Sequence, residues 1–383
     1  MNILLTTHQM AAYEGSEIYT FELAKGLKQA GHTVVVYSRY IDIFEYPFAR
    51  MGIELVTDLK NLTDRSFDVA HVHHNINALE VRHHFPKLPI FFLSHGAATF
   101  LETPPGVDIN ITQYGAISER VAASLVKSGV KRENILLVNN IVNDTLFTSD
   151  TPINKSPKKA LIISNRMDQA TAEKIKKACD KMKIEVTAVG KVFQKADNTD
   201  IPKLINKVDI VFTIGRGVIE TMFCGRIPFV FDLKGGDGIL TTRKFYNSAK
   251  HHFSGKNKNI QFTVSGIVKE LKKYDQTQGE KLKLLAHSQY STAQCVEKLE
   301  KIYATTIKNY SYKKINSKLL QYVVEAVAVT RLHTFSRSEK RGRVDKLKYF
   351  VKDFPVMAKE RWVALSIPSI SSIFGIRSFL QTR

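Results

Sequence analysis

A glutamate near the start of a predicted helix is the clearest candidate for binding chemistry. Glu220 follows the loop Gly215-Arg216-Gly217, which itself follows an apolar strand. A carboxylate in this place reaches back toward a ligand at the strand ends, and it can accept two hydrogen bonds from the vicinal hydroxyls of a ribose. The alternative is a first-turn acid that complements the helix dipole.

The loop before Glu220 has residue types that suit a diphosphate. Gly215 and Gly217 have no side chain, so backbone amides can approach phosphate oxygens at a helix N-terminus. Arg216 between them can supply a charge-assisted contact to the same oxygens. The alternative for so short a motif is an ordinary turn.

Two places in the N-terminal half suit a reaction centre. Gly15 and Ser16 lie in the loop before the first predicted helix, where exposed amides favour an anion. His95 ends an apolar strand, which places its imidazole at the edge of the sheet where α/β folds bind ligands. An ordinary strand-to-helix turn and a structural histidine are the alternatives.

The remaining histidine clusters do not indicate a metal. They occur at 71, 73 and 74, at 83 and 84, and at 251 and 252, and none combines metal-ligand spacing with acids on one helix face. We interpret them as structural or solvent-facing, and we expect neither a catalytic metal nor a cofactor.

Two series of alternating strands and helices must position these residues. The first has strand patterns at 2–6, 33–37, 69–72, 90–93, 109–112 and 135–138, with helical patterns at 18–30 and 118–128. The second has strands at 160–163, 185–189, 208–213 and 227–231, with helices at 170–182, 202–207 and 218–224. Helical patterns follow at 291–308 and 315–329.

A polar segment with two prolines, residues 149–159, separates the two series. We therefore predict an α/β fold with two Rossmann-like domains that face a cleft. The predicted boundaries are 1–150 for the first domain and 159–308 for the second. Residues 309–383 form a basic, mainly helical extension.

The order of these motifs resembles the GT-B glycosyltransferases, specifically the family 4 type (glycosyltransferase group 1), over residues 1–308. The resemblance is carried by the opening strand, loop and helix, by DVAHVHH at 68–74, by LSHG at 93–96, and by residues 114–147. Its most specific part is VDIVFTIGRGVIETMFCGRIPFVFDLKGGDG at 208–238.

The resemblance implies an enzyme that transfers a sugar from a nucleotide-sugar donor with retention of configuration. It implies that Glu220 binds the donor ribose and that Arg166, after the first strand of the second domain, binds the diphosphate. Gly15, Ser16 and His95 would contact the donor or shape the reaction centre. The donor would lie on the second domain and the acceptor on the first.

The sequence departs from the family at one acidic position. Many members carry a second glutamate eight residues before the helix glutamate, in contact with the transferred sugar, and that position here is Phe212. We therefore expect sugar contacts from the amides of Gly235 and Gly236, or from Asp237.

Charge indicates an anionic partner. The formal net charge is +20, and residues 331–383 have twelve Lys or Arg against four Asp or Glu, interleaved with aromatic residues. Such a segment suits an anionic membrane surface beside a glycan or lipid-linked acceptor, although a solvated basic helix is the alternative. We expect no nucleic acid, because the sequence has no helix-turn-helix, zinc finger or stacked-aromatic module.

Other features favour a cytoplasmic protein, peripheral on the inner face of the cell membrane. Three scattered cysteines do not make a disulfide framework, and MNILLTT is typical of a buried strand rather than a secretion signal. No uncharged apolar run reaches the roughly 18 residues that span a bilayer.

We therefore expect a glycosyltransferase of cell-surface polysaccharide or glycolipid synthesis. One alternative is a nucleotide-sugar epimerase of the same fold, which would not release free nucleoside diphosphate. The other is a non-catalytic, membrane-bound scaffold subunit, which would bind no nucleotide.

Overall fold

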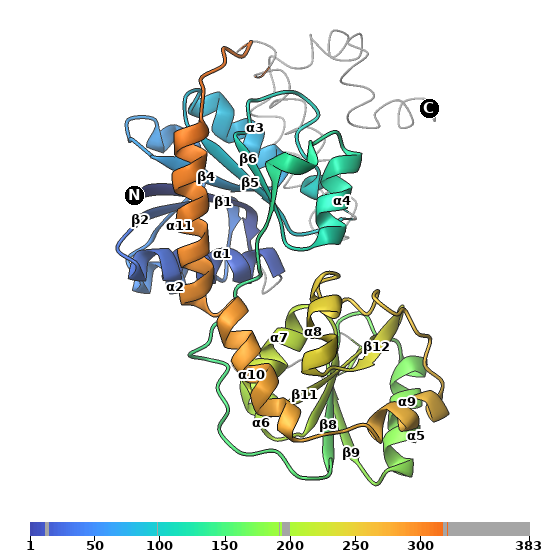
Figure 1. The fold of residues 1–383 in the computed structure, drawn as a ribbon. Coiled ribbons are helices and arrows are strands. Elements are labelled where there is room, and N and C mark those ends of the chain that lie inside the picture. Colours follow the sequence, from blue (N-terminus) through green and yellow to red (C-terminus); the bar gives the residue numbers. More distant parts are fainter. Residues whose placement is uncertain (12–14, 98, 191, 194–199, 317–319, 321–383) are drawn as a thin grey trace, which may run out of the picture.

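The computed structural model describes residues 1–11, 15–97, 99–190, 192–193, 200–316 and 320. Two sheets, the first parallel and the second parallel except for its last strand, are each covered by helices on both faces, one above the other in Figure 1. The predicted α/β fold with two Rossmann-like domains is thus confirmed. Of the predicted basic, mainly helical extension 309–383, residues 310–316 are described and form no helix, and residues 317–319 and 321–383 lie outside the described part of the chain.

The first domain contains a sheet of seven parallel strands in the order β3-β2-β1-β4-β5-β6-β7. The strands are β1 Asn2–Met10, β2 Thr33–Ile41, β3 Glu54–Val56, β4 Val69–His73, β5 Ile90–Ser94, β6 Gln113–Ala116 and β7 Ile135–Leu137. The α-helices are α1 Gly15–Gln29, α2 Glu45–Arg50, α3 Asn75–His84 and α4 Glu119–Lys127. Short 3-10 turns are η1 Leu59–Leu62, η2 Phe100–Glu102 and η3 Arg132–Asn134.

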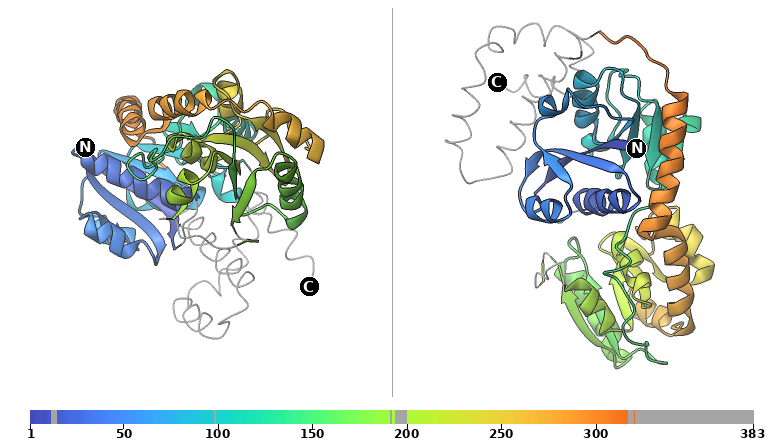
Figure 2. Two further views of the ribbon diagram at one scale, coloured as in Figure 1. Left: turned by 90° about the horizontal axis from the view of Figure 1, so that it is seen from below. Right: turned by 90° about the vertical axis from the view of Figure 1, so that its left-hand side faces the viewer.

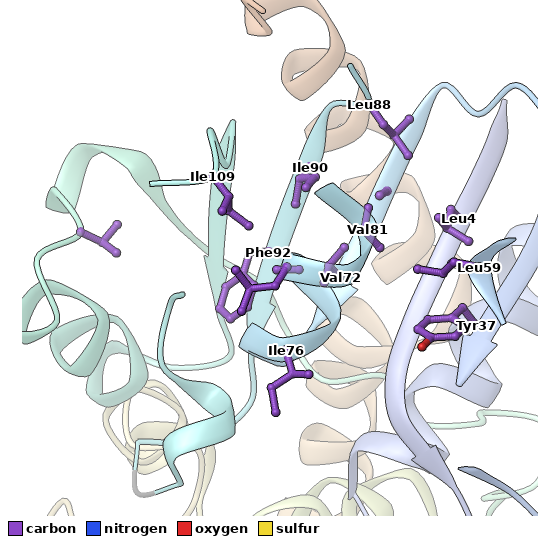
Figure 3. Close-up of a cluster of buried hydrophobic side chains, with 14 of the residues drawn as sticks. Leu4, Tyr37, Leu59, Val72, Ile76, Val81, Leu88, Ile90, Phe92 and Ile109 are labelled. Carbon is purple, nitrogen blue, oxygen red and sulfur yellow. The ribbon is translucent and has the colours of Figure 1, made fainter. Parts of the chain in front are cut away.

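Buried apolar side chains fill both faces of this sheet. Figure 3 shows the cluster beneath α3, where Leu4, Val72 and Phe92 point from neighbouring strands toward Ile76 and Val81. Such strands read as near-continuous apolar runs because both of their faces are covered, which is why most were recognisable in the sequence.

One predicted strand is wrong. Residues 109–112 do not form a strand, and β6 begins at Gln113. The cause is a turn, because Asn110 has a left-handed φ of 57° and its N–H donates to Oδ1 of Asp108 at 2.9 Å. An extended ladder cannot pass through a residue in that conformation.

The second domain contains a five-stranded sheet in the order β12-β11-β10-β8-β9. The parallel strands are β8 Lys159–Ile163, β9 Glu185–Val189, β10 Ile210–Thr213 and β11 Ile227–Asp232, and β12 Gly235–Ile239 is antiparallel to β11. The helices are α5 Gln169–Lys181, α6 Ile201–Asn206, α7 Arg216–Phe223, α8 Thr242–Ala249, α9 Val264–Leu271 and α10 Thr277–Tyr290.

The last described helix returns to the first domain. Helix α11, Thr292–Asn309, lies along the first domain in both figures that show the whole ribbon, Figures 1 and 2. Its Val296, Leu299 and Tyr303 are buried among side chains of α1 and of the first sheet. Residues 292–308, which the sequence boundary assigned to the second domain, therefore pack on the first.

The chain crosses between the domains at two adjacent segments. One segment follows β7 and the other joins α10 to α11. They meet where Val142 forms a bridge with Ser291, and the Val142 N–H donates to the Tyr290 carbonyl at 3.2 Å. The two segments that link the domains are thus hydrogen-bonded to each other.

Candidate functional site

The second sheet reverses its strand order between β8 and β10, because β9 lies on the far side of β8 from β10. Ligands of open parallel sheets bind outside the carboxyl ends of the strands at such a reversal. Arg166 follows β8, and Gly215 and Arg216 follow β10. The fold therefore brings three of the predicted donor-binding residues to one edge.

The loop that carries Arg166 is pinned by its neighbours. Oγ of Ser164 accepts the N–H groups of Arg166 and Met167 at 3.0 and 2.9 Å, and its own hydroxyl donates to Asp232 at 3.0 Å. The Arg166 side chain is exposed, and its guanidinium makes no hydrogen bond or ion pair within the described part of the chain. A fixed backbone with an uncommitted cation suits the binding of an anion.

Glu220 and Arg216 form a tight ion pair on α7. Nε of Arg216 donates to Oε1 of Glu220 at 2.6 Å, one helical turn apart, and both side chains are largely buried. Nη1 of Arg216 also donates to the carbonyl of Ile141 at 3.0 Å, on the crossing segment. The pair fixes the direction of the Glu220 carboxylate, and it occupies the guanidinium that the sequence predicted for phosphate.

The two glycines of this loop are required by backbone conformation and close packing. Gly215 has a φ of 61°, and its N–H donates to the Phe253 carbonyl at 2.9 Å. A Cβ at position 217 would lie 2.4 Å from Oγ1 of Thr213, so a glycine is needed for α7 to pack on β10. The amide of Gly215 is thus bonded within the second domain, and the role of this loop in phosphate binding stays a prediction.

Phe212 lies inside the sheet. It is fully buried in β10 and stacks on Phe229 with 4.6 Å between ring centroids. Only Ile214 and Gly215 separate β10 from α7, so the position eight residues before Glu220 falls within a core strand. Phe212 is therefore a core residue of the second sheet.

Gly235, Gly236 and Asp237 belong to strand β12. The N–H of Gly236 donates to the Ile260 carbonyl at 3.0 Å. The Asp237 carboxylate accepts the Ser248 hydroxyl at 2.9 Å and the Lys258 N–H at 2.8 Å. These contacts are internal to the second domain, and the role of the three residues in sugar binding stays a prediction.

In the first domain, Gly15 and Ser16 open helix α1. Gly15 is exposed, with open space where a Cβ would lie. The Ser16 hydroxyl donates to Glu17 at 2.8 Å, and Glu17 also accepts from the side chain of Gln9 at 3.0 Å. The preceding residues 12–14 lie outside the described part of the chain.

His95 ends β5 in a pocket of rings. Its ring meets Tyr19 and His73 edge-on, at centroid distances of 4.5 and 4.6 Å. Burial lowers the pKa of His95 to about 4, a shift that Glu102 opposes and His74 reinforces. The ring is therefore neutral near pH 7, and its Nε2 is buried without a hydrogen-bond partner among the described residues.

Sequence reasoning missed the residues that support His95. The His95 N–H donates to Oε2 of Glu102 at 2.6 Å, and Oε1 of Glu102 lies 3.6 Å from Nε2 of His74. His74 has a left-handed φ of 71° at the end of β4. The two residues lie 28 positions apart in sequence, and no local pattern links them.

His71 and His73 are buried in a chain of polar contacts. Nδ1 of His73 lies 3.2 Å from Oγ1 of Thr20, the Nε2 atoms of the two histidines lie 3.0 Å apart, and Nδ1 of His71 lies 2.5 Å from the Tyr303 hydroxyl. Burial, as the largest cause, lowers both pKa values well below 6.5. This arrangement ties α11 to the interior beneath α1.

His252, which we had interpreted as structural or solvent-facing, lies beside Gly215. Its ring atoms would lie 3.8 and 3.9 Å from a Cβ at Gly215. Burial, as the largest cause, and the charges of His95 and Arg216 together lower the pKa of His252 to about 4. The charge of His95, a residue of the first domain, thus acts on a residue of the second.

Within the described residues, no group of three or more His, Cys, Asp or Glu side chains is placed to hold a metal ion. No helix of that part of the chain combines the length and the apolar content that a membrane span requires.

Solved structures share this two-domain architecture. A complex of Anabaena HepE with UDP and glucose superposes with a TM-score of 0.55 at 14% sequence identity, covering 80% of this chain and 100% of that one. A glycosyltransferase from Rickettsia africae gives 0.57 at 15% identity, with coverages of 81% and 99%. The lipopolysaccharide outer core galactosyltransferase WaaB gives 0.50 at 13% identity, with coverages of 80% and 100%.

These likenesses establish the GT-B arrangement of the fold. No protein-family model matches the sequence, and no curated protein matches it.

Proposed function

We propose that this protein is a glycosyltransferase that moves a sugar from a nucleotide-sugar donor to an acceptor hydroxyl. The observation that carries the proposal is the Arg216–Glu220 pair, held at 2.6 Å beside the strand reversal of the second sheet. A carboxylate whose direction is fixed before binding loses little conformational freedom when it accepts the two hydroxyls of a ribose.

The donor diphosphate would lie between Glu220 and Arg166. The Arg166 guanidinium is exposed and makes no hydrogen bond or ion pair within the described residues, and phosphate oxygens are its natural partners. The positive end of α7 lies at the same edge and adds a favourable field for an anion. Arg216 acts in this arrangement by orienting Glu220.

The transferred sugar would lie toward His95 in the first domain. A neutral imidazole with an unpartnered, buried Nε2 can hydrogen-bond a sugar hydroxyl. Gly15 and Ser16 offer the N-terminus of α1 to the departing diphosphate. Stabilisation of that leaving group by cations and amides supports transfer with retention of configuration, without a metal ion.

The acceptor would be a glycan or a lipid-linked glycan of cell-surface synthesis. The support is the basic and aromatic segment 331–383, whose composition suits docking on an anionic membrane from the cytoplasmic side. UDP is the first nucleotide to test, because HepE was solved with UDP, with UDP and glucose, and with UDP-glucose.

A thermal-shift screen tests the proposal. The wild-type protein, Glu220→Ala and Glu280→Ala are heated with UDP, GDP, CMP and their sugar conjugates. Glu280 is the matched control, because it is an exposed glutamate of α10 that pairs with Lys283. We expect one nucleotide to raise the melting temperature of the wild type and of Glu280→Ala, but not of Glu220→Ala. If none of these nucleotides or sugar conjugates raised the melting temperature of the wild type, the proposal would be contradicted.

A further inference from the structure

The turn after helix α8 faces the first domain. The pKa of its His252 is lowered mainly by burial and also by the charge of His95, which belongs to the first domain. Lys256, farther along the same turn, has a lowered pKa chiefly because Arg120 of α4 lies nearby. In Figure 1, α7 and α8 lie at the end of the second domain that is nearer to the first. The turn therefore belongs to the surface on which the two domains meet.

The backbone of this turn is held in an unfavourable conformation. His252 and Phe253 have successive left-handed φ values of 52° and 50°, which L-residues with a Cβ adopt reluctantly. The Phe253 N–H donates to the Ser248 carbonyl at 2.9 Å, and the Phe253 carbonyl accepts the Gly215 N–H at the same distance. These two bonds fix the turn against both α8 and the start of α7.

At the start of α7, this turn takes up the Gly215 N–H and places the imidazole N–H of His252 nearby. Because the Gly215 N–H is used by Phe253, it is not available to a phosphate. The His252 ring lies instead against Gly215, where a Cβ would approach it to 3.8 Å. The ring is half-buried and, with its lowered pKa, neutral near pH 7, so its N–H can donate to an anion without the cost of desolvating a charge.

An independent observation marks the same region as a ligand site. Nε2 of His95 is buried and has no hydrogen-bond partner among the described residues. Buried polar atoms in native structures are nearly always paired, so an unpaired one points to a group that binds there. His95 comes from the first domain and His252 from the second, and the charge of His95 contributes to the lowered pKa of His252.

We propose that His252 is a substrate-contacting residue whose imidazole N–H donates a hydrogen bond to the diphosphate of the donor. The inference rests on the proposed function and adds a residue to its site. In the transfer, the bond from the sugar C1 to the phosphate oxygen breaks, and its electron pair stays on that oxygen. The acceptor oxygen bonds to C1, and its proton passes to the departing diphosphate. His252 keeps its proton and stabilises the charge that develops on the leaving group.

Calorimetric titration of UDP and of uridine into full-length variants tests the inference. His252→Gly removes the imidazole and relieves the left-handed backbone, so its melting temperature should equal or exceed that of the wild type. We expect this variant to bind UDP about tenfold or more weakly, as for the loss of a hydrogen bond to a charged group, and to bind uridine within about twofold of wild type. His252→Asn, which keeps an N–H donor and tolerates this backbone, should recover part of the UDP affinity.

His251→Ala is the matched control, because it changes the adjacent histidine of the same turn, and it should bind both ligands as the wild type does. Unchanged UDP affinity in His252→Gly, or an equal loss for UDP and uridine, would overturn the inference while leaving the proposed function intact. A wild-type protein that bound neither UDP nor uridine would instead overturn the UDP-donor proposal on which the inference rests.

Discussion

The lowered pKa of His252, in the turn after α8, predicts that the folded protein loses stability at acidic pH. Burial lowers the pKa of His252 to about 4 in the folded protein, against an ordinary value of 6.5 in the unfolded chain. Between these two values the unfolded state binds more protons, so stability rises with pH. The contribution of His252 is complete above about pH 6.5 and is lost as the pH falls toward 4.

The size of the effect follows from the two pKa values. At pH 5 the unfolded imidazole is almost fully protonated and the folded one is almost fully neutral. Proton linkage then costs the folded state about 2 kcal/mol for this one group, relative to pH 7. The Glu102 carboxylate beside His95 adds little to the pH dependence of stability between pH 5 and 7, because its pKa is lowered from 4.5. Burial raises this pKa, but hydrogen bonding to His74 and the charges of His95 and His74 outweigh that effect.

Urea unfolding followed by circular dichroism measures this contribution. The wild type and His252→Gln are unfolded at pH 7 and at pH 5 at the same ionic strength. We expect the loss in unfolding free energy between the two pH values to be about 2 kcal/mol smaller in His252→Gln than in the wild type. Equal losses in the two proteins would refute the assignment of a buried, neutral imidazole to this position.

Three packing predictions concern the framework of the site. Gly217→Ala should lose about 1–3 kcal/mol of unfolding free energy, since its Cβ would lie 2.4 Å from Oγ1 of Thr213, and adding Thr213→Ala should recover most of it; a neutral single variant would contradict the packing. Tyr303→Phe leaves Nδ1 of His71 without its 2.5 Å partner and should cost about 1–3 kcal/mol by the same assay; no loss would mean that the buried chain adds nothing to stability. Arg226→Met removes a buried guanidinium that donates to carbonyls of the segment before β8 and of α6, and should cost about 3 kcal/mol; unchanged unfolding would count against that tie.

Strands and helices with strong local patterns were predictable. Residues 185–189 form β9 as expected, and the predicted helix at 170–182 is α5 displaced by one residue. Periodicity and capping determine such elements locally, because Asp168 caps α5 through the Thr171 N–H at 2.8 Å. The turn at Asn110, which displaced the predicted strand, depends on a left-handed residue that no apolar pattern reveals.

The tertiary placement of elements was less predictable. Helix α11 follows the second domain in sequence but packs on the first, and its apolar face would suit either core. No strand was predicted at residues 235 and 236, yet pairing of Gly236 with Phe231 and of Gly235 with Asp232 places them in β12. In both cases the deciding partner lies on another element.

The site divides in the same way. Glu220 and Arg166 follow strands at a sheet edge, and strand order alone brings such residues together. The pairing of Arg216 with Glu220 follows from their i, i+4 spacing, but the contact with the Ile141 carbonyl does not. His252 is 36 residues beyond Arg216, and only the folded turn after α8 brings it to Gly215.

The central claim is that Glu220 binds the ribose diol of a donor nucleotide. The direct measurement is a double cycle of dissociation constants, with UDP and 2′,3′-dideoxy-UDP titrated into the wild type and into Glu220→Gln. Glutamine still offers an oxygen to Arg216, so the pair at 2.6 Å can persist in the variant. We predict that either change alone weakens binding roughly 10- to 150-fold, and that both together weaken it no further. If the two changes together weakened binding by the product of their separate effects, or if Glu220→Gln bound UDP as tightly as the wild type, the account would be contradicted.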